Sequence, residues 1–142
     1  MYKTEIRVNP DNPDAGMYTV AFYDEGAVIL SCTKNVTHVN IPAAINGKSV
    51  IRIGSEAFML HPHLLSVTLP DTVRTIGDAA FMGCFALMSV HAGKGLEAVE
   101  AGAFGDCVNL QEVDFPSRPR ASLSAFAGCY QLEAAREPVL YP

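Results

Sequence analysis

The sequence predicts a right-handed repeat solenoid of about four coils, an α/β superhelix that is mostly β with short helical turns. Apolar residues recur at a nearly constant spacing, and the repeated unit contains a short stretch in which apolar and polar residues alternate. The composition agrees with a folded chain, because 49% of the 142 residues are hydrophobic and 18% are charged. We therefore expect one domain with a parallel sheet that gains one strand per repeat.

The repeat is visible in six sets of residues that share a period of 23, which shortens to 22 at the fourth repeat. The sets are Phe58, Phe81, Phe104 and Phe126; Leu64, Leu87, Leu110 and Leu132; Cys84, Cys107 and Cys129; Val67, Val90 and Val113; Ile53, Ile76 and Val99; and Val50, Val73 and Leu96. Equivalent positions in successive coils of a solenoid stack on one another. We therefore expect every set to form a buried ladder.

A single repeat has the local chemistry of one coil. Residues 65–69 alternate apolar and polar side chains, which predicts a half-buried inner strand. Gly77 permits a tight bend after a second short apolar stretch. Residues 78–82 are typical of a single helical or 3₁₀ turn, with Asp78 as its cap. Phe81 is then expected at the centre of the coil.

Residues 67–87 resemble the BspA-like leucine-rich repeat, whose pattern is Leu-x-x-Ile-x-Ile-Pro-x-x-Val-x-x-Ile-Gly-x-x-Ala-Phe-x-x-Cys-x-x-Leu. Residues 36–64 resemble a first repeat of the same family, with five additional residues around a turn-forming Asn46-Gly47. The resemblance covers Val36 to Leu132. It implies leucine-rich repeats at 36–64, 65–87, 88–110 and 111–132.

Two repeats depart from the pattern. The third has Ala92-Gly93 where the second has Leu69-Pro70. The fourth lacks the Val-x-x-Ile-Gly phrase and has residues 117–122 in its place, so the sequence leaves its outer strand open.

The two ends are expected to cap the solenoid, since stacked apolar ladders need covering. Residues 1–35 contain a first strand around Ile6 and Val8, then two strands at 17–22 and 27–30 around a turn, which predicts an N-terminal β-hairpin cap. Residues 133–142 are interpreted as a degenerate repeat or a cap, with Pro138 where the proline of the repeat is expected.

The polar positions of the inner strands form the candidate binding face. Stacked strands lie about 4.8 Å apart, so two columns should tile one patch. The columns are His38, Ser66, Ser89 and Glu112, and then Asn40, Thr68, His91 and Asp114. A protein or glycan ligand on this face is the functional interpretation, and a solvated sheet face without a ligand is the alternative.

Ser89, His91 and Asp114 have the residue types of a hydrolase triad. Alternate residues on one strand are about 6.6 Å apart, which is too far for Ser89 to reach His91 easily. The sequence also has no Gly-x-Ser-x-Gly elbow, and an open sheet offers no oxyanion hole. We therefore predict a protein that is not an enzyme and needs no cofactor.

For three further motifs we prefer a structural interpretation over a functional one. The repeated cysteines form a core ladder instead of a disulfide or metal site, because stacked Cβ vectors run parallel. His61-Pro62-His63 is a turn with two surface histidines instead of a metal site. Residues 11–16 only faintly resemble a calcium loop and lack the distal Glu. Cys32 lies outside the repeats and its state is left open.

Charge and hydropathy exclude several classes of function. The net charge of −5 and a pI near 5.2 disfavour a nucleic-acid binder, and the nearby pair Arg118 and Arg120 is expected in a solvated loop. No apolar run approaches the length of a membrane span. The first five residues lack the apolar region of a secretory signal, which leaves a cytoplasmic protein or an exported one whose signal has been removed.

The resemblance implies a bacterial surface role, because BspA-like proteins are typically exported and several act in adhesion. A module that binds protein or glycan is therefore the expected function. A structural spacer or assembly unit in a larger repeat array is the alternative.

Overall fold

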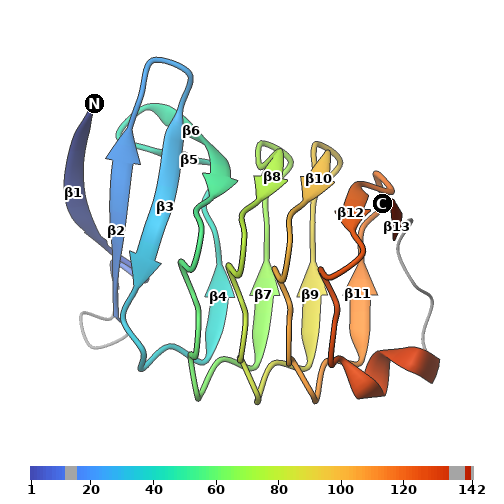
Figure 1. Ribbon diagram of the computed structural model, residues 1–142. Coiled ribbons are helices and arrows are strands. Elements are labelled where there is room, and N and C mark those ends of the chain that lie inside the picture. Colours follow the sequence, from blue (N-terminus) through green and yellow to red (C-terminus); the bar gives the residue numbers. More distant parts are fainter. Residues whose placement is uncertain (12–15, 135–139, 142) are drawn as a thin grey trace.

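The computed structural model describes residues 1–11, 16–134 and 140–141, and it shows a mostly-β solenoid with parallel sheets (Figure 1). The predicted fold class is therefore confirmed. The strands are β1 (Tyr2–Arg7), β2 (Met17–Phe22), β3 (Ala27–Cys32), β4 (His38–Asn40), β5 (Ala44–Ile45), β6 (Lys48–Ile53), β7 (Ser66–Thr68), β8 (Thr75–Ile76), β9 (Ser89–His91), β10 (Ala98–Val99), β11 (Glu112–Asp114), β12 (Arg120–Ser122) and β13 (Leu140–Tyr141), with a 3₁₀ helix η2 (Tyr130–Ala134) before β13.

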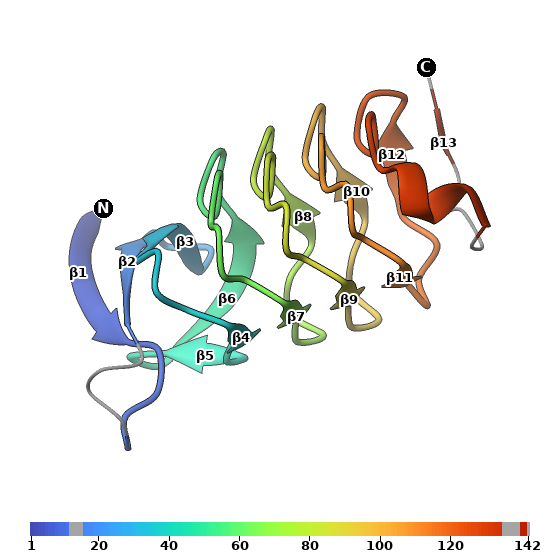
Figure 2. The same cartoon turned by 90° about the horizontal axis from the view of Figure 1, so that it is seen from below.

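The coils are joined by two sheets (Figures 1 and 2). The inner sheet has the order β4-β7-β9-β11, and all its pairings are parallel. The outer sheet has the order β1-β2-β3-β6-β8-β10-β12-β13, with β5 paired to β6. It is parallel from β3 onward and antiparallel in the β1-β2-β3 cap. One inner and one outer strand per coil enclose the core between them.

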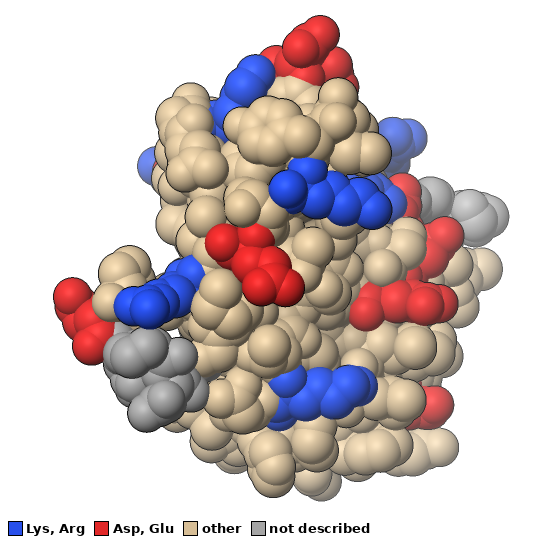
Figure 3. Space-filling model, turned by 90° about the vertical axis from the view of Figure 1, so that its left-hand side faces the viewer, with Lys and Arg blue, Asp and Glu red and all other residues tan. Residues whose placement is uncertain are grey.

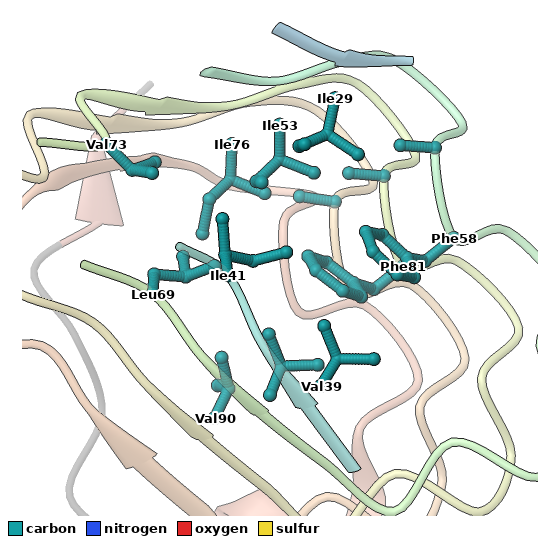
Figure 4. Packing of buried hydrophobic residues seen from close by; sticks show 14 of the residues in the cluster. Ile29, Val39, Ile41, Ile53, Phe58, Leu69, Val73, Ile76, Phe81 and Val90 are labelled. Atoms are coloured by element: carbon teal, nitrogen blue, oxygen red, sulfur yellow. The ribbon is translucent and has the colours of Figure 1, made fainter. Parts of the chain in front are cut away.

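The expected N-terminal hairpin is confirmed as β2 and β3. Strand β3 pairs in parallel with β6 and sets Ile29 opposite Ile53, which in turn faces Ile76 (Figure 4). The apolar ladder of the outer sheet therefore begins inside the cap, one strand earlier than the repeat spacing indicates. The hairpin covers the first coil because it continues the hydrogen bonding and the core of that coil.

The five additional residues of the first repeat are accommodated in a small antiparallel hairpin of β5 and the start of β6. Its turn is Asn46-Gly47, with φ of 50° and 79°. Both central residues of a tight hairpin turn of this kind need positive φ, which Asn and Gly adopt most readily. The insertion is thus absorbed at the surface without shifting the stacked positions.

Stacked phenylalanines form the centre of the core (Figure 4). Ring centroids lie 5.0 Å apart for Phe58 and Phe81, 5.1 Å for Phe81 and Phe104, and 5.2 Å for Phe104 and Phe126. The first three of these rings are fully buried. Near-parallel rings about 5 Å apart match the separation of neighbouring coils, so the stacked ladder is confirmed, although Phe126 at its end is only partly buried.

The alanine before each phenylalanine explains the Ala-Phe signature. The backbone N–H of Phe58 donates to the carbonyl of Ala80, Phe81 donates to Ala103, and Phe104 donates to Ala125, each at 2.7 Å. The coils therefore also pair along this turn, and the alanines are buried there. A larger side chain would push the coils apart and break that pairing.

Residues 78–82 differ from the expected helical turn. They form successive hydrogen-bonded turns, and Ala79 has a φ of 55°, which interrupts any helix. Asp78 does not cap its own turn, because its Oδ1 accepts the N–H of Ala101 in the next coil at 3.1 Å. Gly77 has ordinary φ, and its missing Cβ leaves room for the backbone of Gly54 and Ser55. Contacts between coils, and not local helix signals, shape this segment.

The two departures from the repeat are both accommodated. Ala92 remains buried, and Gly93 lets Asp71 of the preceding coil approach its backbone, where Asp71 Oδ1 accepts the N–H of Lys94 at 2.8 Å. The sequence did not decide whether the fourth repeat has an outer strand. The structure has one there, β12, which pairs in parallel with β10. Backbone pairing with the preceding coil supplies the strand where the motif is lost.

Candidate functional site: the inner-sheet face

The inner sheet aligns the eight predicted site residues in two rows. Register places His38, Ser66, Ser89 and Glu112 opposite one another, and it places Asn40, Thr68, His91 and Asp114 in a second row. Between the two rows run the central valines of the strands, which face the core. Strand alternation therefore turns all eight polar side chains outward, where they are exposed or half-buried.

His91 connects the second row to both carboxylates of β11. Its Nε2 lies 3.4 Å from Glu112 Oε2, and its Nδ1 lies 3.5 Å from Asp114 Oδ2. Both carboxylate side chains are 64% exposed. These contacts are long for hydrogen bonds, so the imidazole neighbours the acidic pair without fixing it.

At the other end of the face, His38 Nδ1 and Ser66 Oγ are 2.6 Å apart. This side-chain bond joins β4 to β7 across the sheet. The imidazoles, hydroxyls and carboxylates of the two rows give the face both donors and acceptors, which suits recognition by hydrogen bonds.

The geometry does not assemble a hydrolase triad. Both nitrogens of His91 face carboxylates, and among the described residues the hydroxyl of Ser89 makes no hydrogen bond to His91. A nucleophilic serine needs a base within hydrogen-bond reach. The three residues are neighbours in the sheet, but they are not connected in the order that the chemistry requires.

A shallow groove of about 330 Å³ crosses the start of the inner strands. Ser66 and Ser89 line its middle, His38 lies at the end nearest the cap, and Gln111 and Glu112 lie at the other end. Its apolar wall is formed by Leu65 and Met88, which are 37% and 46% exposed. A second hollow of about 320 Å³ lies beside β4, between residues 8–10 and 35–40.

Sequence reasoning missed this apolar wall. It counted Leu65 as a core position of the inner strand, but β7 begins at Ser66 and Leu65 stands outside it. The equivalent position one repeat later is Met88. The period would have revealed the pair, since both directly precede an inner strand at a spacing of 23.

The repeated cysteines are a core ladder, as expected. All four cysteines are buried and free. The thiols of Cys84, Cys107 and Cys129 donate to the carbonyls of Phe58, Phe81 and Phe104 in the preceding coils, at 3.0, 3.1 and 2.9 Å. Cys32 lies in β3, and burial raises the pKa of its thiol to about 12. These thiols contribute to packing between coils.

His61 corrects the prediction of two surface histidines. His63 is exposed, but His61 is 2% exposed and its Nε2 lies 2.8 Å from the carbonyl oxygen of Cys32. His61 occupies the ladder position of Cys84 one repeat earlier. It therefore bonds to the cap as each cysteine bonds to its preceding coil.

The other motifs singled out in the sequence add no further residues to the candidate site. The faint calcium motif at residues 11–16 falls mostly outside the described residues. Within the described part of the chain, no three His, Cys, Asp or Glu side chains are grouped to hold a metal ion. Arg118 and Arg120 are exposed, as expected, and Arg120 begins β12.

Charges at the N-terminal end are mixed. Figure 3 shows basic and acidic side chains interspersed over this end, with no large patch of one sign. Among the described residues, no helix is long and apolar enough to cross a membrane.

Comparisons with known proteins agree with the repeat and the fold. A family model described as the BspA type leucine rich repeat region matches residues 51–138 in six copies. The leucine-rich repeat protein of T. pallidum is 29% identical with a TM-score of 0.77, over 81% of this chain and 55% of that one. A leucine-rich repeat protein from Bacteroides capillosus is 26% identical with a TM-score of 0.63, over 87% of this chain and 85% of that one.

A leucine-rich cell surface protein from Faecalibacterium prausnitzii shares the fold at 23% identity and a TM-score of 0.52, over 81% of this chain and 36% of that one. No curated protein matches the chain. The chain spans little more than half of the T. pallidum protein. From the stacked repeat, the two parallel sheets and the family match, we conclude that this chain belongs to the BspA-type leucine-rich repeat family.

Proposed function

We propose that this solenoid is a recognition module that binds a protein or glycan partner on its inner face. The observation that carries the proposal is the alignment of eight polar side chains in two rows on one open sheet. Such extended faces are the surfaces that solenoids use for binding. The mechanism is non-covalent and needs no cofactor.

The rigidity of the face supports this role. The backbones of β7 and β9 are paired on both sides, and their central valines are fully buried. Side chains on such strands are presented with little backbone freedom left to lose. A partner that docks there therefore incurs a small entropic cost from the solenoid.

The setting that we propose is the surface of a bacterial cell, in adhesion to a host or to neighbouring cells. Its support is the resemblance to the BspA-like family, whose members are typically exported.

The test is a binding screen of the chain against extracellular-matrix proteins and glycans, with His91→Arg beside it. Arginine at this position reaches Glu112 and Asp114 and fills the middle of the face, so we expect a hit to be lost. Ala101→Arg is the matched control, because Ala101 is exposed on a turn away from the inner sheet.

Loss of binding in His91→Arg with retention in Ala101→Arg supports inner-face recognition. Equal binding by all three proteins contradicts it. A folded chain that binds nothing in the screen favours the spacer or assembly unit.

A further inference from the structure

The groove at the start of the inner strands is apolar on one side and acidic at one end. Leu65 and Met88 form the apolar wall, and Glu112, with Gln111 before it, closes the end farthest from the cap. The two apolar residues lie on adjacent coils, where the N–H of Met88 donates to the carbonyl of Leu65 at 2.9 Å, so together they offer one small apolar contact beside polar groups. A ligand that fits this groove must offer an apolar group to the wall.

The acidic end has no basic partner within the inner sheet. Neither the four inner strands nor the residue before each of them contains a lysine or arginine. Glu112 and Asp114 are largely exposed, and His91 is the side chain that neighbours both. Charge complementarity therefore favours a ligand with a cationic group at this end.

The distance between the apolar wall and Glu112 sets the distance between the apolar and the cationic group of the ligand. A side chain seated between Leu65 and Met88 lies about one and a half strand spacings, or about 7 Å, from Glu112 on the next strand. Side chains two residues apart on an extended peptide are separated by about the same distance. An apolar residue and a basic residue at positions i and i+2 would therefore fill both places.

We infer that the inner face takes an extended peptide segment, running across the coils, that carries an apolar side chain and a Lys or Arg two residues apart. This inference rests on the proposed function and narrows its partner to a protein. The apolar side chain lies against Leu65 and Met88, and the cationic group lies against Glu112, which is separated from Asp114 by the His91 imidazole. Ser66 and Ser89 line the groove beneath the peptide, and Ser89 offers its hydroxyl to the peptide backbone, since the Ser66 hydroxyl is already bonded to His38.

The test measures fluorescence anisotropy of labelled synthetic pentapeptides with the intact chain. The first has the sequence Ser-Leu-Thr-Lys-Ser. Three others change one feature each: Leu to Ser, Lys to Glu, or the order to Ser-Lys-Leu-Thr-Ser, which removes the spacing. We expect the first peptide to bind most tightly, and its binding to weaken as the salt concentration rises, since the contact is exposed.

Variants of the chain locate the contact. Glu112→Gln should weaken binding of the first peptide about fivefold, the order expected for one exposed ion pair. Glu97→Gln changes the net charge equally at an exposed site outside the inner sheet and should leave binding unchanged. His91→Gln should retain binding, whereas His91→Arg should abolish it, because the guanidinium occupies the acidic pair.

Two results would overturn the inference. One is the absence of binding by any peptide to the folded chain, and the other is binding that Glu112→Gln leaves intact. Either result leaves the screen with matrix proteins and glycans to decide the broader proposal. One outcome of that screen is a partner that binds the chain but not His91→Arg, and that the Ser-Leu-Thr-Lys-Ser peptide does not displace. That result would support recognition on the inner face and reject a peptide with an apolar and a basic side chain as the ligand.

Discussion

Individual side chains in this protein act mainly between coils. Asp78, Asp71 and the three ladder cysteines each hydrogen-bond to a backbone group in the adjacent coil. Local sequence rules therefore misassigned Asp78 as the cap of its own turn. The residue types that define the repeat are explained by their stacked neighbours.

Truncation of a single side chain in the phenylalanine ladder should strongly destabilise the protein. Phe81→Ala removes a fully buried ring that stacks on Phe58 and Phe104, and it should lower the free energy of unfolding by about 3–5 kcal/mol. Phe85→Ala is the control, because Phe85 is 52% exposed. Urea unfolding of the two variants checks the difference, and equal stabilities would reject the ladder as the centre of the core.

Among the elements, the strands were predictable to different degrees. The alternating pattern of residues 65–69 and the hairpin at 17–30 were visible because local patterning and core packing agree there. Strand β12 was not, since the fourth repeat lacks the phrase that marks an outer strand. Its pairing with β10 is imposed by the preceding coil, which no local pattern records.

The cap is joined to the first coil by His61, which the local sequence pattern placed at the surface. His61 replaces the ladder cysteine and bonds to the carbonyl of Cys32 in β3. The pattern His61-Pro62-His63 suggested a surface turn because its local composition is polar. Its place in the 23-residue period would have indicated a buried position.

We expect His61→Ala to loosen the cap. The change leaves the carbonyl of Cys32 without its side-chain donor and opens a cavity beside Phe58, for a combined loss of about 2 kcal/mol. Relative to the wild-type chain, amide hydrogen exchange should then become faster in β3 and stay the same in β9. His63→Ala, at the exposed neighbouring histidine, should leave exchange unchanged. Similar exchange in both variants would mean that His61 does not hold the cap.

At the scale of the whole molecule, the solenoid is a linear stack in which each coil contacts its neighbours. The inner sheet inherits its order from that stack, so eight residues far apart in the sequence form two straight rows. The period alone predicted these rows. It did not predict the groove and its apolar wall, because these depend on where each strand begins.

Recognition on the inner face can be followed residue by residue in amide NMR spectra of the intact chain during titration with the Ser-Leu-Thr-Lys-Ser peptide. We expect shift changes at Ser66, Ser89 and Glu112, with the outer-sheet residues Thr75 and Ala98 unchanged. Changes confined to the outer sheet or the cap, with the inner strands unaffected, would contradict it.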